Sequence, residues 1–135
     1  MKGMTAAVVG ISATVLVGGA VAVAPPAKAD CTQGSCYGAI AYSTSNGNAR
    51  SDINNPSQSV ADNNAIAGCN KAGNVNDCEV VVRGMQCLAL ATVPTGENEL
   101  YYGGIGSTKS AADAAALAGH SGFTIEVEEC NAGSS

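Results

Sequence analysis

The chain has 135 residues and a formal net charge of −5, and it is 46% hydrophobic but only 4% aromatic. Its length suits one domain with a modest core. Without the first 29 residues, four basic and 11 acidic residues remain, which gives a net charge of 4 − 11 = −7. This charge disfavours unassisted binding to nucleic acid or to anionic lipid, so we expect neither as a partner.

The first 29 residues have the pattern of an export signal. Lys2 is followed by a long apolar stretch, and Ala27-Lys28-Ala29 forms a small-residue cleavage site before Asp30. We expect a signal peptide over residues 1–29 and a single secreted domain over residues 30–135, with no membrane contact after cleavage. A retained anchor is the alternative, because the apolar stretch approaches the roughly 20 residues that cross a bilayer.

The first half of the expected domain is predicted to run strand, strand, helix, strand. Alternating bulky and small residues indicate the first strand, and Asn46-Gly47 is typical of a hairpin turn. Glycine favours a helix end at Gly68. The expected elements are strands at 36–43 and 48–53, a helix from Ser57 or Ser59 to about Gly68, a polar loop at 70–77 and a strand at 78–83.

Spacing in this first helix leaves two faces open for burial. One face consists of Val60, Asn64 and Ala67, and the other of Ala61, Ala65 and Gly68. The sequence alone does not decide between them.

The second half repeats the same order. Its expected elements are strands at 86–93 and 99–105, joined by a turn containing Pro94-Thr95-Gly96, then a helix at 108–118 and a strand at 122–129. The sequence therefore predicts an α+β fold of two tandem strand-strand-helix-strand repeats, at about 36–83 and 86–130, with mainly antiparallel sheet, two helices and disulfide staples.

The repeat also suggests how the cysteines pair. Residues 59–68 return 51 positions later as residues 110–119, after which His120 stands in place of Cys69, and Cys78 has no counterpart. Two cysteines that are absent together indicate a bonded pair. An even number of cysteines in an exported chain favours disulfides over metal ligation. The expected pairs are Cys69 with Cys78, Cys31 with Cys36, and Cys87 with Cys130.

Three patterns are candidates for a chemical role, but none predicts a catalytic, cofactor or metal site. His120 is the single histidine and suits the negative end of a helix or the surface, since no sequence context supplies it with a nucleophile. The glycine-rich segment 103–109 lacks the order of a phosphate loop and is better explained by close backbone packing and an N-cap at Thr108. Glu126 and Glu128 are expected on one solvated strand face, with Ile125 and Val127 on the other.

The segment between Cys69 and Cys78 is the one candidate binding epitope, because a disulfide would hold this polar loop away from the core. Its candidate contact residues are Asn70, Lys71, Asn74 and Asp77.

Several motifs in their order resemble an uncharacterised family of exported actinobacterial proteins, many of them mycobacterial, known as domain of unknown function 4189. They are the opening Tyr-Gly-Ala-Ile-Ala-Tyr-Ser at 37–43, the helix motif at 61–69, and the segments at 78–82, 87–91, 102–106 and Cys130-Asn131. The resemblance implies secretion and a compact duplicated domain, and it carries over no catalytic residue. This chain departs from it by lacking tryptophan and by adding Cys31 and Cys36.

We therefore expect a secreted, non-catalytic interaction protein at the cell envelope or with a host or environmental partner, which is a protein or an envelope component. One alternative is a small secreted hydrolase that uses His120 beside a serine or carboxylate. Another is a protease or lysozyme inhibitor that presents the Asn70–Asp77 loop. The sequence does not identify the partner or the oligomeric state.

Overall fold

Eight helices and strands follow one another in the computed structural model, which describes residues 31–32, 34–95 and 98–134. They are β3 (Tyr37–Tyr42), β4 (Ala49–Asn55), α1 (Gln58–Gly73), β5 (Glu79–Gly84), β6 (Cys87–Thr95), β7 (Asn98–Gly106), α2 (Lys109–Leu117) and β8 (Thr124–Cys130). The expected signal segment lies outside the described residues. All of these elements belong to the unit that begins at Cys31.

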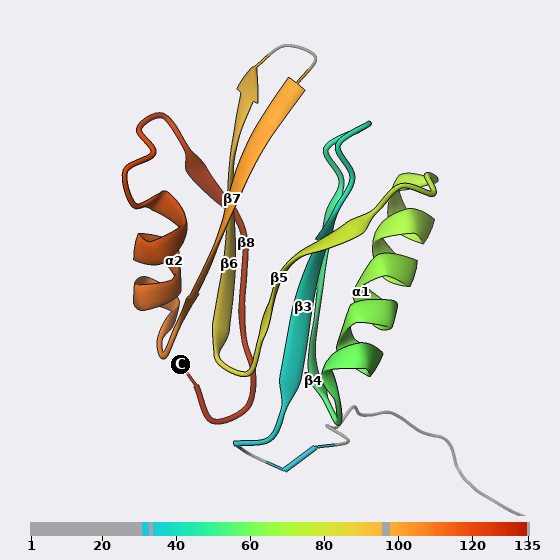
Figure 1. The fold of residues 1–135 in the computed structure, drawn as a ribbon, viewed down its shortest axis with the longest axis vertical. Coiled ribbons are helices and arrows are strands. Elements are labelled where there is room, and N and C mark those ends of the chain that lie inside the picture. Colours follow the sequence, from blue (N-terminus) through green and yellow to red (C-terminus); the bar gives the residue numbers. More distant parts are fainter. Residues whose placement is uncertain (1–30, 33, 96–97, 135) are drawn as a thin grey trace, which may run out of the picture. The chain divides into compact units, whose positions relative to one another are not determined.

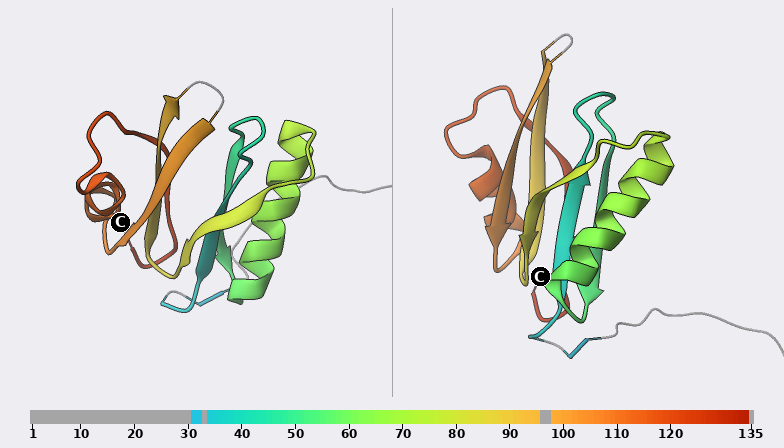
Figure 2. Two further views of the ribbon diagram at one scale, coloured as in Figure 1. Left: turned by 45° about the horizontal axis from the view of Figure 1, so that its top comes forward. Right: turned by 45° about the vertical axis from the view of Figure 1, so that its right-hand side comes forward.

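Each half forms its own three-stranded antiparallel sheet. The strand orders are β4-β3-β5 and β7-β6-β8, so the first strand of each half lies in the centre. One buried cluster lies between α1 and the first sheet, one between the two sheets, and one between the second sheet and α2. The result is four layers with a helix on each outer face (Figures 1 and 2), and it confirms the predicted α+β class with two similar halves.

Alternation of small and large side chains along the central strands sets these layers. In β3, Ala39 and Ala41 pack against α1, whereas Ile40 and Tyr42 face the other sheet. In β6, the alanines at 89 and 91 pack against α2, and the leucines at 88 and 90 face the first sheet. Successive side chains of a strand point to opposite faces, so the small ones let each helix approach closely.

The two helices begin in equivalent ways. The side chain of Ser57 accepts a hydrogen bond from the Val60 N–H, and the side chain of Thr108, 51 positions later, accepts one from the Ala111 N–H. These caps satisfy amide groups that the first turn leaves without helical partners. The buried residues of α1 are Ala61, Ala65 and Cys69, and those of α2 are Ala112 and Ala116. Burial therefore falls on the face of Ala61 and Ala65, one of the two faces that the sequence left open.

The predicted end of the first helix at Gly68 is wrong, because α1 continues to Gly73. Asn74 has a left-handed backbone with φ of 55°, and its N–H bonds to carbonyls of the last turn, which is how a helix commonly ends. Gly119, the equivalent of Gly68, has φ of 72° and follows the end of α2. The same glycine thus lies inside one helix and beyond the end of the other.

Other boundaries differ less from the prediction. Pro94 and Thr95, which were predicted in a turn, belong to β6, while Gly96 lies outside the described residues. β8 pairs with β6 only as far as Thr92, so Pro94 lies where β7 is the one neighbouring strand, a position that tolerates proline. All three predicted disulfides are present: Cys31–Cys36, Cys69–Cys78 and Cys87–Cys130.

A buried asparagine joins the two halves. Asn131, directly after β8, is fully buried, and its side-chain amide donates to the carbonyls of Gly84 and Gln86 at 3.2 and 2.9 Å. Its side-chain oxygen accepts from the N–H of Asn54 in β4 at 2.9 Å. The Asn54 side chain in turn accepts from the Ala132 N–H at 2.7 Å. The end of the second half is therefore hydrogen-bonded into the first sheet.

Candidate functional site

His120 lies against aromatic rings. Its ring stacks on Tyr102 with centroids 3.4 Å apart and an interplanar angle of 9°, and Phe123 contacts both rings from the side. Its backbone N–H donates to the carbonyl of Leu117, the last residue of α2. Among the described residues, no serine or carboxylate is hydrogen-bonded to the imidazole. The arrangement that the hydrolase alternative requires is not found there.

The glycine-rich segment before α2 packs closely against that helix. A Cβ on Gly104 would overlap the backbone of Ala112 and Ala116, and a Cβ on Gly106 would lie 2.6 Å from the Ala112 nitrogen. Glycine is needed here because strand and helix backbones nearly touch. The expected explanation by close packing and the Thr108 cap is confirmed.

Glu126 and Glu128 do not share a face, so the prediction for this pair is wrong. The register between β6 and β8 shifts between Leu90 and Ala91, which pair with Val127 and Ile125 respectively. Such a bulge adds a residue and reverses the alternation beyond it. Val127 consequently packs between the sheets and Ile125 against α2.

The bulge gives the two carboxylates different surroundings. Glu126 accepts a hydrogen bond from the Thr92 hydroxyl at 3.0 Å. Glu128 lies against α2, where its pKa is raised, first by a hydrogen bond shared with Asp113. The Lys109 ammonium lies 4.0 Å from Glu128 and acts in the opposite direction. The Glu128 carboxyl group therefore holds its proton more tightly than an isolated glutamate does.

The predicted epitope between Cys69 and Cys78 is only partly a loop, because residues 70–73 belong to α1. Asn70 accepts from the Cys78 N–H at 3.0 Å, and Asp77 accepts from the buried Ser43 hydroxyl at 2.7 Å. That hydrogen bond is the first cause of a lowered pKa of Asp77. Lys71 and Asn74 are exposed. Two of the four predicted contact residues thus stabilise the fold, and two are accessible.

Exposed apolar side chains gather elsewhere, on a surface that the sequence analysis missed. Of the six large hydrophobic side chains exposed among the described residues, four belong to β7 and one lies beside it. We call these five the apolar strip: Met85, Leu100, Tyr101, Tyr102 and Ile105, which are 37–50% exposed. The sixth, Val60, is on α1. A detectable signal was the run Leu-Tyr-Tyr, since a strand with one solvated face would alternate with polar residues.

Both faces of β7 contribute to the strip. Tyr101 faces the first sheet, where its ring lies 5.0 Å from that of Tyr42, and Tyr102 faces the side of α2, where it stacks on His120. Ile105 lies 3.4 Å from the position that a Cβ on Gly84 would occupy, beside Met85. The strip therefore follows β7 down to the connection between β5 and β6.

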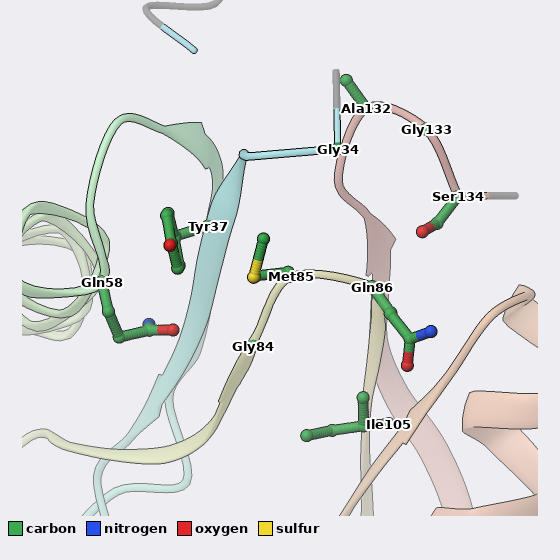
Figure 3. A pocket seen from close by; sticks show the side chains of 10 residues that line it. All are labelled: Gly34, Tyr37, Gln58, Gly84, Met85, Gln86, Ile105, Ala132, Gly133 and Ser134. Atoms are coloured by element: carbon green, nitrogen blue, oxygen red, sulfur yellow. The ribbon is translucent and has the colours of Figure 1, made fainter. Parts of the chain in front are cut away.

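A hollow of about 660 Å³ lies at that lower end, where the two sheets meet (Figure 3). Its walls include Tyr37, Gln58, Met85, Gln86 and Ile105, and residues 132–134 close one side. Its volume lies in the range of small-ligand sites. The lining is mainly apolar side chains and backbone, and among the described residues no three His, Cys, Asp or Glu side chains gather to hold a metal ion.

Neither α1 nor α2, the helices of the described part of the chain, has the length and apolar character needed to cross a membrane.

Comparison with known proteins gives a family and a fold. The family model described as "Domain of unknown function (DUF4189)" matches residues 37–132. The NMR structure of Rv1813c from Mycobacterium tuberculosis is similar to this chain, with 25% sequence identity and a TM-score of 0.56. That similarity covers 88% of this chain and 100% of the other. No curated protein matches.

Proposed function

The chain belongs to the family described as domain of unknown function 4189. From the surface of the chain itself, we propose that it is an exported, non-catalytic binding protein. It recognises a protein or an envelope component outside the cytoplasm, either at the cell envelope or on a host or environmental partner.

The apolar strip is the observation that carries this proposal. Five of the six exposed large hydrophobic side chains in the described residues lie together on or beside β7. Scattered apolar residues are normal on a protein surface, whereas a contiguous group is characteristic of interaction sites. Aromatic side chains in particular are enriched at protein interfaces.

The scaffold supports binding because it fixes this surface in advance. β7 is held to β6 by nine consecutive residue pairs, and the Cys87–Cys130 disulfide joins β6 to β8. A surface that is already ordered loses little conformational entropy when a partner binds. Disulfides also persist in the oxidising surroundings that exported proteins meet, which supports the proposed location.

A capture experiment tests the proposed function. The oxidised protein is immobilised and exposed to envelope extracts and to host-cell lysate, beside a Leu100→Ser/Tyr102→Ser variant. Val60→Ser is the matched control, since Val60 is the exposed apolar residue outside the strip. A Lys71→Ser/Asn74→Ser variant tests the epitope predicted from the sequence.

We expect saturable capture of one partner by the wild type, the control and the Lys71/Asn74 variant, and its loss in the strip variant. Loss in the Lys71/Asn74 variant alone would move the site to α1. Absence of a saturable partner in either extract would contradict the binding function.

The location is tested by the mass of the protein recovered from the culture medium. We expect a chain that begins at Asp30. A full-length chain that stays with the membrane fraction would support the retained anchor instead.

A further inference from the structure

We infer that β7 takes up an extended peptide segment of a partner protein as a fourth strand of the second sheet. This inference rests on the proposed binding function and specifies how the apolar strip is used. The segment would hydrogen-bond along the free edge of β7, in the manner of strand addition. Its side chains would pack on the strip.

The two sheets of the described chain have four edges, which differ in how well they are protected against pairing. β4, β5 and β8 all carry charged residues: Arg50 and Asp52, Glu79 and Arg83, and Glu126, Glu128 and Glu129. All three also pair with their central strand through a shifted register. Charges and bulges are the usual means by which proteins prevent added strands.

The edge formed by β7 has neither protection along most of its length. It pairs with β6 without a register shift from Thr95–Asn98 to Cys87–Gly106, and it pairs with no other strand of the described residues. From Leu100 to Gly106 it contains no charged residue and no proline. It therefore presents a regular row of backbone donors and acceptors that suits a further strand.

Side chains on both faces of β7 would contact the added strand. Leu100 and Tyr102 lie on the face toward α2, and Tyr101 and Ile105 lie on the face toward the first sheet. Neighbouring side chains of an added strand also alternate between these two faces. Consecutive aliphatic or aromatic residues, with no polar alternation, would consequently suit the bound segment.

The hollow gives the lower end of the added strand a place for one large side chain. Ile105 and Met85 belong both to the strip and to the walls of the hollow (Figure 3). A segment that follows β7 toward Gly106 passes Ile105 and reaches this hollow. Strand addition commonly takes affinity from the main chain and specificity from such side-chain pockets.

The strip fits a peptide segment better than a second copy of the chain. Its five side chains offer at most roughly 400 Å², if the 150–250 Å² of a fully exposed aromatic side chain is taken as the scale for all five, whereas a stable interface buries about 800 Å² on each partner. Two copies would also bring together like net charges, because residues 30–135 carry 11 acidic and four basic residues. Lysine or arginine flanking the apolar residues of the segment would complement this charge.

The probe is a phage library of random 12-residue peptides, selected on the full-length oxidised protein. The best peptide is then synthesised in three forms: unmodified, and with N-methyl groups on one or on the other set of alternate backbone amides. We expect the unmodified peptide to slow hydrogen exchange at amides of β7 and N-methylation on one set of alternate amides to weaken binding at least tenfold. Leu100→Lys should abolish binding, whereas Val60→Lys, the matched control, should retain it.

Three results would overturn strand addition. The N-methylated peptides of both sets could bind as tightly as the unmodified one, β7 exchange could stay unchanged on binding, or selection could enrich no peptide on the wild type over Leu100→Lys. Partner capture that persists despite any of these three results would leave the proposed binding function intact.

Sedimentation provides a separate test. If the free protein sedimented as a dimer and Leu100→Lys dissociated it, the edge of β7 would be assigned to a second copy of the chain, and the inference would be overturned as well. The exchange measurement uses the wild type, so it holds even if a variant fails to fold.

Discussion

The two halves have the same order of strands and helix, but the chain around the end of the helix is held in different ways. In the first half, Cys69 lies in α1 and bonds to Cys78, directly before β5, and the helix has 16 residues. In the second half, His120 replaces that cysteine, α2 has nine residues, and the imidazole stacks on Tyr102 of β7. A disulfide therefore holds this region in the first half, whereas contact between aromatic rings holds it in the second.

This difference leaves the two sheets with different surfaces. The short α2 packs on Gly104 and Gly106, and beyond its end the rings of His120 and Phe123 lie over Tyr102. Tyr102 nevertheless remains partly exposed beside Leu100. The half that lacks the short disulfide is thus also the half that has the accessible apolar surface.

The largest expected effects come from two variants, each of which lacks the disulfide of one half. The free energy of unfolding should fall by about 4 kcal/mol in Cys87→Ser/Cys130→Ser and by roughly 2 to 3 kcal/mol in Cys69→Ser/Cys78→Ser, because the longer loop restricts the unfolded chain more. Urea denaturation of both variants measures this. An equal loss in both would mean that loop length does not control the difference between the halves.

A smaller but substantial effect is expected from Asn131, which joins the halves. Asn131→Ala removes three side-chain hydrogen bonds from a buried site, and we expect a loss of about 3 kcal/mol of unfolding free energy. Asn131→Asp is the informative partner variant, because a carboxylate keeps the acceptor for Asn54 but cannot donate to Gly84 and Gln86. Both should show reduced thermal midpoints in calorimetry. A wild-type midpoint in either would contradict the bridging role.

The equivalent glycines should respond in opposite directions. Gly68→Ala lies inside α1 with only the flexible Arg50 side chain at 3.4 Å, so it should stabilise the protein by about 0.5–1 kcal/mol. Gly119→Ala should destabilise it by about 1–2 kcal/mol, because φ there is 72°. Chemical denaturation of the two single variants checks the signs. Matching signs would show that the two positions do not differ in backbone as described.

The smallest effects should appear in the dependence of stability on pH. Hydrogen bonding by Ser43 lowers the pKa of Asp77. The ionised Asp77 therefore stabilises the folded protein above the pKa that this group has in the unfolded chain, and this stabilisation is lost as the pH falls through its pKa in the folded protein. The hydrogen bond with Asp113 raises the pKa of Glu128. The protonated Glu128 therefore stabilises the folded protein below the pKa that this group has in the unfolded chain, and this stabilisation is lost as the pH rises through its pKa in the folded protein.

Variants of the two groups separate these opposite trends. Relative to the wild type, Asp77→Asn should be destabilised at pH 7, with the difference shrinking below about pH 4. Glu128→Gln should gain stability over the wild type as pH rises toward 7, since it removes the repulsion with Asp113. Unfolding curves across this range provide the measurement. Parallel pH profiles for the two variants would refute the contrast.

Sequence reasoning predicted the features that local chemistry determines. The caps at Ser57 and Thr108, the alternation in the central strands and the offset of 51 residues were sufficient for the helices, most strands and the three disulfides. These signals are short-range, or they are repeated within the chain. Comparing the two copies was what identified the Cys69–Cys78 pair.

The features that were missed depend on tertiary context. Gly68 carries the same local signal as Gly119, and only the continuation of α1 to the Asn74 cap distinguishes them. The bulge in β8 arises from pairing with β6 and leaves no mark in the alternation of Ile125 to Glu128. The apolar strip could be predicted only if it were known that β7 lies at a sheet edge. Strand order is a long-range property that one sequence does not reveal.

The position of Asn131 also bears on the order in which the molecule can be completed during synthesis. No residue beyond Gly84 is needed for the strand pairs of the first sheet, for α1 or for the Cys69–Cys78 disulfide. All of their residues are therefore present once the chain has been synthesised as far as Gly84. The central strand β6, in contrast, waits for Cys130, and Asn54 waits for a partner 77 residues further along. In a chain that is threaded through a membrane from its amino end, the first sheet could therefore form early, whereas the second sheet and its connection to the first would wait for Cys130 and Asn131.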